Sequence, residues 1–235
     1  MTFQEVMTQL EAFGDAQTKK TLGVHGAKEP YFGVKVADLK KILKKTKKNH
    51  ELSLELFATG NSDAMYLAAL CADESKMTKA ILNQWADQAY WYYLNEYAVP
   101  WVAGDTDFGF ELGLEWIDSD KEQVVACGWS ALASFAAVNT DDRLDIQAYS
   151  KLLDRVEKTI HQAPNRLPYV MNGFVIAIGS YVPELTEKAK KVASTIGKVS
   201  VVMATGNCKV PLALDYIQKV EDKGRIGKKR KTARC

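Results

Sequence analysis

The chain has 235 residues, of which 47% are hydrophobic and 26% charged, with only 15 glycines and 6 prolines. This composition can bury a sizeable core, and it excludes a disordered, collagen-like or low-complexity chain. The net charge of +2 excludes nothing as a total, but its distribution is uneven. Residues 19–48 hold ten lysines against two acids, and residues 223–235 hold seven basic residues and no acid. Two basic blocks therefore flank an acidic middle, which favours a polyanionic partner, although one block alone is equally typical of a solvated helix face.

Apolar residues recur three and four positions apart along most of the chain, which predicts one helix after another. Helices are expected at residues 2–13, 36–45, 51–58, 63–72, 77–88, 91–103, 108–117, 121–138, 143–162, 167–181, 183–196 and 211–220. Residues 199–203 alternate and are mostly β-branched, so a short β-hairpin or extended loop is expected over 199–210, with a frayed helical turn as the alternative. A glycine-punctuated basic tail follows from residue 223.

The junctions between these helices recur with an irregular period. Residues 56–63 and 115–122 share a pattern of apolar residues, a polar break and a new apolar helix, and the break at 162–166 again precedes an apolar helix. This recurrence predicts an all-α fold of HEAT-like helical pairs, stacked as a curved superhelix with a concave face. We expect a single domain over residues 1–235. A compact non-repeat bundle is the alternative.

The sequence lacks the signals that mark several classes of protein and of binding site. The longest mostly apolar stretch, residues 124–138, is too short for a membrane span of about 20 residues, and no signal peptide is evident at the N-terminus. The four cysteines and three histidines are scattered, without metal-ligand spacing, and phosphate-binding glycine motifs are missing. We therefore expect a cytoplasmic protein with reduced thiols, without metal, cofactor or membrane contact.

Residues 85–101 contain three tryptophans and four tyrosines. Aromatic rings stack on unstacked bases and ammonium groups bind phosphates, so this run beside two basic blocks indicates nucleic-acid binding. The alternative is that the rings are large core fillers between stacked helices.

The helical pairs, the basic tail and the spacing W-x-x-x-[D/N] from Trp91 to Asn95 resemble the HEAT-like repeat DNA alkylation-repair superfamily. The resemblance covers nearly the whole chain. It implies a concave basic groove that wraps DNA, and in the AlkD-like alkylpurine glycosylases it implies excision of N3- and N7-alkylated purines. This chain departs from that branch at three positions. Asn95 replaces an aspartate, residues 126–129 replace an arginine pair, and residues 174–176 replace a second tryptophan.

The replacement at Asn95 matters for chemistry. An alkylated purine is already cationic and leaves readily, so the enzyme mainly stabilises the cationic sugar, which a carboxylate does and a neutral carboxamide does not. Glu96 is adjacent but about 100° away around an α-helix. Asp87 shares the face of Trp91 only if the helix is unbroken, and Asp105 repeats the spacing from Trp101. These three are the candidate replacements.

The sequence thus predicts a DNA-binding protein of a branch without the usual glycosylase site (AlkF/AlkG-like), which recognises branched or distorted DNA and is associated with the nucleoid when bound. An active alkylpurine glycosylase and a HEAT-type protein–protein scaffold are the alternatives. The lysines of the first basic block are expected to line one edge of the groove, and the cations of the tail to contact phosphates from its other end. With the two lysines beside the 199–210 segment, the expected phosphate contacts are Lys40, Lys41, Lys44, Lys45, Lys47, Lys48, Lys198, Lys209, Arg225, Lys228, Lys229, Arg230, Lys231 and Arg234.

Overall fold

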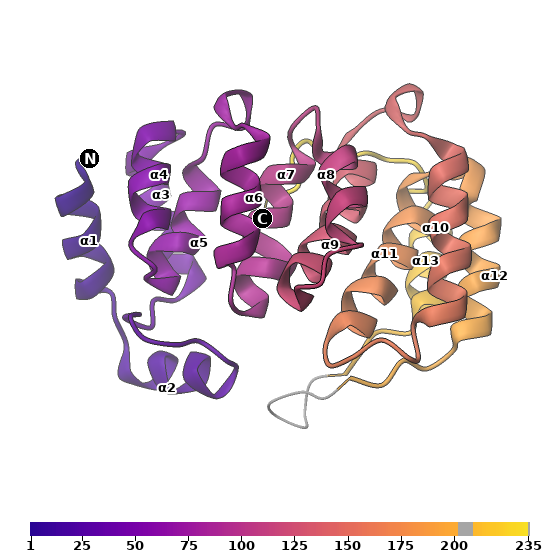
Figure 1. Cartoon of the computed structure of the whole chain (residues 1–235), viewed down its shortest axis with the longest axis horizontal. Helices are drawn as coiled ribbons and strands as arrows, with labels where there is room; N and C mark the ends of the chain where they lie inside the picture. Colours follow the sequence, from indigo (N-terminus) through magenta and orange to yellow (C-terminus); the bar gives the residue numbers. More distant parts are fainter. Residues whose placement is uncertain (202–208, 235) are drawn as a thin grey trace.

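The computed structural model describes residues 1–201 and 209–234, and its helices form a curved stack that follows the chain from one end to the other (Figure 1). The helices are α1 (Phe3–Ala12), α2 (Ala16–Val24), α3 (Val36–Thr46), α4 (His50–Ala58), α5 (Ser62–Cys71), α6 (Lys79–Gln88), α7 (Val99–Gly104), α8 (Gly109–Trp116), α9 (Glu122–Val138), α10 (Ile146–Thr159), α11 (Leu167–Tyr181), α12 (Thr186–Ile196) and α13 (Ala213–Asp222). A π-helical segment, η2 (Tyr93–Ala98), leads directly into α7. Short 3₁₀ turns occupy Glu74–Lys76, Asp141–Arg143 and Pro183–Leu185.

The all-α, HEAT-like prediction is confirmed, with ends that differ from the expected ones by a few residues. The sequence missed α2, because only Leu22 of this helix is buried and no apolar periodicity marks it. Of the segment expected to form a hairpin, residues 199–201 and 209–210 are irregular and residues 202–208 lie outside the described part of the chain. Neither described range contains a β-strand, and none of its helices is long and apolar enough to cross a membrane.

The helices form an outer and an inner layer. Outer helices α4, α6, α8, α10 and α12 each pack on the inner helix that follows in the chain. The inner layer consists of α5, η2 with α7, α9, α11 and α13, each in contact with the next. Pairs approach closely: a Cβ on Gly128 of α9 would lie 2.7 Å from the Ile117 backbone nitrogen. Two large clusters of buried side chains, Leu-, Ala- and aromatic-rich, fill the space between the layers.

The four inner helices α5, α7, α9 and α11 run parallel. Their N-terminal ends lie at one edge of the stack and their C-terminal ends at the other. At the N-terminal edge, Trp91, just before η2, donates from Nε1 to Ser62 Oγ of α5 (2.9 Å), and Asn165 before α11 donates to Glu122 of α9 (2.7 Å). At the C-terminal edge, residues of the C-terminal tail bond to the ends of all four helices.

Residues 227–234 run across the C-terminal ends of these inner helices, and we call this segment the C-terminal strap. Lys229 Nζ donates to the carbonyls of Tyr181 (2.7 Å) and Ala136 (3.0 Å), at the ends of α11 and α9. Arg234 donates to the Ala72 carbonyl after α5 (2.7 Å). The last carbonyls of a helix lack intrahelical partners and lie at the negative end of its dipole, so a cationic chain stabilises them. The strap therefore ties four successive inner helices together.

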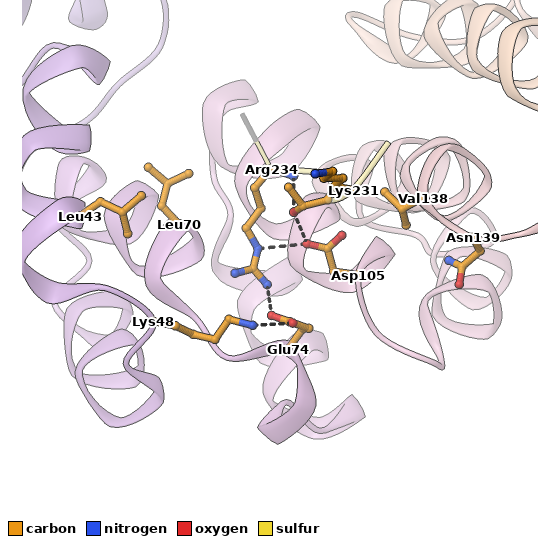
Figure 2. A pocket seen from close by; sticks show the side chains of 10 residues that line it. Leu43, Lys48, Leu70, Glu74, Asp105, Val138, Asn139, Lys231 and Arg234 are labelled. Atoms are coloured by element: carbon orange, nitrogen blue, oxygen red, sulfur yellow. Dashed lines mark hydrogen bonds and ion pairs between the residues drawn. The ribbon is translucent and has the colours of Figure 1, made fainter. Parts of the chain in front are cut away.

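This arrangement corrects two expectations about the basic blocks. They were placed at opposite ends of the groove, but Lys48 and Arg234 meet on one carboxylate, Glu74, at 2.6 and 2.9 Å (Figure 2). Arg234 also pairs with Asp105 at 3.2 Å, and these residues line a cavity of about 590 Å³. Lys229 and Arg234 were expected to contact phosphates. Their side chains are only 16% and 10% exposed and are held by carbonyls and carboxylates of the protein itself.

We predict that Arg234→Ala lowers the free energy of unfolding by about 2–3 kcal/mol, because Glu74 and Asp105 lose a largely buried charged partner. Chemical denaturation measures this loss. Arg225→Ala is the matched control, since Arg225 is exposed and its side chain has no partner among the described residues; its effect should stay within about 0.5 kcal/mol. Equal effects of the two variants would show that the strap does not stabilise the stack.

Candidate functional site

One cavity, of about 380 Å³, opens at the N-terminal edge of the inner helices. We call it the polar cavity. It brings together the end of α2, the start of η2 and the first residues of α9 and α11: His25, Gly26, Tyr90, Trp91, Tyr92, Asn95, Glu96, Glu122, Gln123, Ala126, Asn165, Arg166 and Leu167. Both residues of the W-x-x-x-[D/N] spacing, Trp91 and Asn95, therefore lie in one cavity, with Glu96 beside them.

A buried carboxylate positions the wall of this cavity that comes from α2. Asp63, in the first turn of α5, accepts hydrogen bonds from the backbone nitrogens of Phe32, Gly33 and Val34 at 2.7, 2.9 and 3.1 Å. Burial raises the pKa of Asp63, and these three donors partly offset that rise. The chain between α2 and α3 is thereby fixed to α5. Tyr90 adds a second tie, since its hydroxyl donates to the Lys28 carbonyl (3.0 Å).

The aromatic run divides between core and cavity. Trp85 stacks on Phe57 with a centroid distance of 4.0 Å, and Trp91 stacks on Tyr93 at 4.6 Å. Trp85, Trp91 and Trp101 are only 3%, 5% and 7% exposed, so most of each tryptophan ring fills the core. The tyrosines at 90, 92, 93 and 97 are half-buried and keep part of each ring accessible.

Asn95 and Glu96 both line the polar cavity, which corrects the expectation that Glu96 points elsewhere. That expectation assumed α-helical geometry, whereas residues 93–98 form a π-helix with more residues per turn. The angle between neighbouring side chains is therefore smaller. Asn95 is 8% exposed and donates from Nδ2 to the Ala89 carbonyl (3.0 Å), so its amide is committed to the protein.

The Glu96 carboxylate is paired with Arg166, the residue before α11. Arg166 Nε and Nη2 donate to the two carboxylate oxygens at 2.6 and 2.8 Å, and the Glu96 side chain is only 2% exposed. Burial raises the pKa of Glu96, while the hydrogen bonds from Arg166 offset part of that rise. The guanidinium also lies over the Tyr92 and Tyr169 rings, at 4.4 and 5.0 Å from their centroids. This geometry neutralises the carboxylate of the cavity.

The other two candidate carboxylates do not line the polar cavity. Asp87 lies at the end of α6 and pairs with Lys121; α6 ends at Gln88, so the unbroken helix needed to align Asp87 with Trp91 does not exist. Asp105 lies at the C-terminal edge, where it accepts from the backbone nitrogen of Ala233 (2.8 Å) in the strap. Within residues 1–201 and 209–234, no three His, Cys, Asp or Glu side chains converge to hold a metal ion.

The lysines nominated from the first basic block do not line the polar cavity either. They lie on and just after α3, and Lys48 is at the C-terminal edge, a full length of α5 away from Trp91. Lys41 pairs with Asp38 (2.7 Å) and Lys45 bonds to Gln9 (3.4 Å). In contrast, Lys40, Lys44 and Lys47 are exposed, and the described part of the chain offers their side chains no partner.

Arg166 is the site residue that sequence reasoning missed. A local signal for it exists: a cation directly before a helix is unfavourable beside the positive end of the dipole, so it indicates an acidic partner elsewhere. The identity of that partner, 70 residues earlier, cannot be read from local spacing.

The sequence and the fold of this chain are similar to those of several known proteins. A family model described as DNA alkylation repair enzyme matches residues 6–194. An uncharacterized protein of Listeria innocua and another of Listeria monocytogenes are each 32% identical over 229 residues, which span 95% of this chain and 99% of the relative. A solved structure matches 100% of both chains, with a TM-score of 0.89 and 38% identity. It is described as a new family of proteins related to the HEAT-like repeat DNA glycosylases with affinity for branched DNA structures.

We predict that Arg166→Met lowers the free energy of unfolding by about 2–3 kcal/mol, because it leaves Glu96 charged and unpaired in a buried site. Burial raises the folded-state pKa of Glu96, so protonation relieves the penalty. The loss should therefore be largest at neutral pH and should shrink as the pH falls through that pKa.

A double-mutant cycle with Glu96→Gln provides the control. The double variant should lose less stability than the two single variants added together, since the neutral amide needs no cationic partner. Additive losses that do not change with pH would contradict a structural ion pair.

Proposed function

Because the chain belongs to the DNA alkylation repair enzyme family, matched over residues 6–194, we propose that it binds branched or distorted DNA without excising bases. The proposal covers the whole chain as one DNA-binding unit in the cytoplasm, associated with the nucleoid when bound. Support for the partner comes from the solved relative, 38% identical over the full length, whose family is described as having affinity for branched DNA.

We infer the absence of base excision from the charge and hydrogen bonding of the two polar side chains beside Trp91. Asn95 is neutral and bonded to the Ala89 carbonyl, and Glu96 is bound through both oxygens by Arg166. Stabilising a cationic sugar needs a carboxylate whose charge is not already balanced. The polar cavity holds the right residue type in a neutralised form, which supports recognition rather than N-glycosidic bond cleavage.

Among the cations expected from the sequence to contact phosphates, we propose this role for those that the protein itself leaves unoccupied. Besides Lys40, Lys44 and Lys47, these are exposed side chains without a partner among the described residues: Lys198, Lys209, Arg225, Lys228, Arg230 and Lys231. Lys229 and Arg234 are left out, because phosphate binding would remove them from the carbonyls that they hold. Phosphate contacts of this kind set affinity and register without reading sequence.

We predict no release of 3- or 7-methylpurine above background when the chain is incubated with methylated duplex DNA. Asn95→Asp should also release none, because the new carboxylate faces the Ala89 carbonyl and the buried Glu96. Chromatography of released bases is the measurement, with a known alkylpurine glycosylase as the positive control. Release by the unaltered chain would instead support the glycosylase alternative, with Glu96 as its carboxylate.

We predict that affinity for a DNA junction falls steeply with salt, with a slope of log K against log salt of roughly −5 if about six phosphates are neutralised. Replacing Lys40, Lys44 and Lys47 with glutamine should make this slope shallower by about 2–3, whereas Lys41, Lys45 and Lys48, already engaged by the protein, are the matched control triple with a smaller effect. Binding unchanged by salt, or by both triples, would favour a protein–protein scaffold.

A further inference from the structure

A second cavity, of about 290 Å³, lies on the exposed face of the inner helices and shares Glu96 with the polar cavity. We call it the aromatic hollow. Its walls are mostly apolar and include four aromatic side chains: Tyr97 and Trp101 from η2 and α7, Tyr169 from α11 and Tyr216 from α13. Tyr97 and Trp101 belong to the aromatic run of residues 85–101, whereas Tyr169 and Tyr216 lie outside it and were given no role from the sequence.

Small side chains of α9 and α11 make the hollow. Ser134 of α9 and Gly173 of α11 line it between the rings. A Cβ on Gly173 would have no heavy atom within 4 Å, and its backbone is helical, so neither packing nor backbone conformation requires glycine there. Glycine in the middle of a helix is unfavourable relative to alanine. The absence of a side chain at Gly173 therefore leaves this part of the hollow open.

The chemistry of the walls fits the flat faces and polar edges of a nucleobase. Tyr97 and Trp101 pack with a centroid distance of 5.6 Å, and the hydroxyls of Tyr97 and Tyr169 lie 3.4 Å apart. Tyr216 is 48% exposed, so its ring is accessible without any change in the fold. Tyr hydroxyls and Ser134 offer donors and acceptors next to apolar surface, which suits a base that has left its stack.

One exposed cation flanks the hollow: Lys209 precedes Pro211, which lines it. The guanidinium of Arg166 lies over Tyr169, at 5.0 Å from the ring centroid, but it is already paired with Glu96. A nucleotide seated in the hollow would place a phosphate near Lys209. An apolar peptide would gain nothing from this cation.

From these observations we propose that the aromatic hollow receives one unpaired base of branched DNA. The inference rests on the proposed function and deepens it. In a continuous duplex both faces of each base are covered by stacking, whereas a base at a branch point is free to leave the helix at low cost. Occupation of the hollow thus gives the chain a preference for branched over linear DNA, independent of its phosphate contacts.

The test fills the hollow without disturbing the core. Gly173→Leu places a side chain in open space, and Gly173→Ala is the matched control that adds only a methyl group. The substrate is a three-way DNA junction that carries 2-aminopurine as an unpaired base at the branch point, compared with a linear duplex that contains the same base paired. Affinity and 2-aminopurine fluorescence are measured, and thermal unfolding verifies that both variants are folded.

With the unaltered chain, we expect the fluorescence of the unpaired 2-aminopurine to be quenched by stacking, and that of the paired base to be unchanged. Gly173→Leu should abolish the quenching and weaken junction binding by about 5- to 150-fold, the range for losing one base–aromatic stack. The salt slope should become shallower by no more than about 1, because at most the single phosphate contact near Lys209 is removed. Tyr216→Ala, at an exposed rim position outside the core, should weaken the quenching in the same way.

The experiment distinguishes failure of this inference from failure of the proposed function. If the unaltered chain binds the junction with a steep salt dependence but neither variant changes affinity or quenching, the aromatic hollow is not a base site and the proposed function stands. If the unaltered chain does not bind the junction at all, the proposed function fails and the inference fails with it.

Discussion

The ion pair between Glu96 and Arg166 is the interaction around which the site is built. It joins η2 to the start of α11 across the intervening α9, and its carboxylate forms part of both the polar cavity and the aromatic hollow. A cation before a helix and a buried carboxylate are each unfavourable alone, and each compensates the other. The same pairing removes the free negative charge that base excision would use, so one interaction both stabilises the curved face and accounts for its proposed chemistry.

Sequence reasoning predicted the helical layers because apolar spacing reports which face of a helix is buried. It failed for α2, where Leu22 is the single buried residue, and for the angle between Asn95 and Glu96, because the π-helix at 93–98 leaves no trace in apolar periodicity. Both residues of the motif, Trp91 and Asn95, line the polar cavity. Sequence reasoning missed Arg166 and the aromatic hollow, because both depend on contacts between residues far apart in the chain.

The distribution of charge along the sequence was the least reliable guide to where the cations lie in the fold. Two basic blocks suggested two ends of a phosphate-binding groove, yet Lys48 and Arg234 share Glu74 at one edge (Figure 2). What separates a structural cation from a free one is the acceptor that it meets: Lys229 reaches two helix-terminal carbonyls, whereas its neighbour Lys228 is exposed. Composition cannot distinguish the two, because the relevant carbonyls lie nearly fifty and more than ninety residues away. The tail thus stabilises the inner layer with two of its cations and leaves the others for phosphates.

The central claim is that the curved inner face recognises DNA by its branching rather than by a damaged base. The most direct measurement is a competition titration at one fixed salt concentration, in which a labelled four-way junction is displaced by unlabelled junction or by linear duplex of the same length and base composition. The account predicts that the junction competes at least about tenfold better, which corresponds to roughly 1.4 kcal/mol. Equal competition by the linear duplex would contradict it.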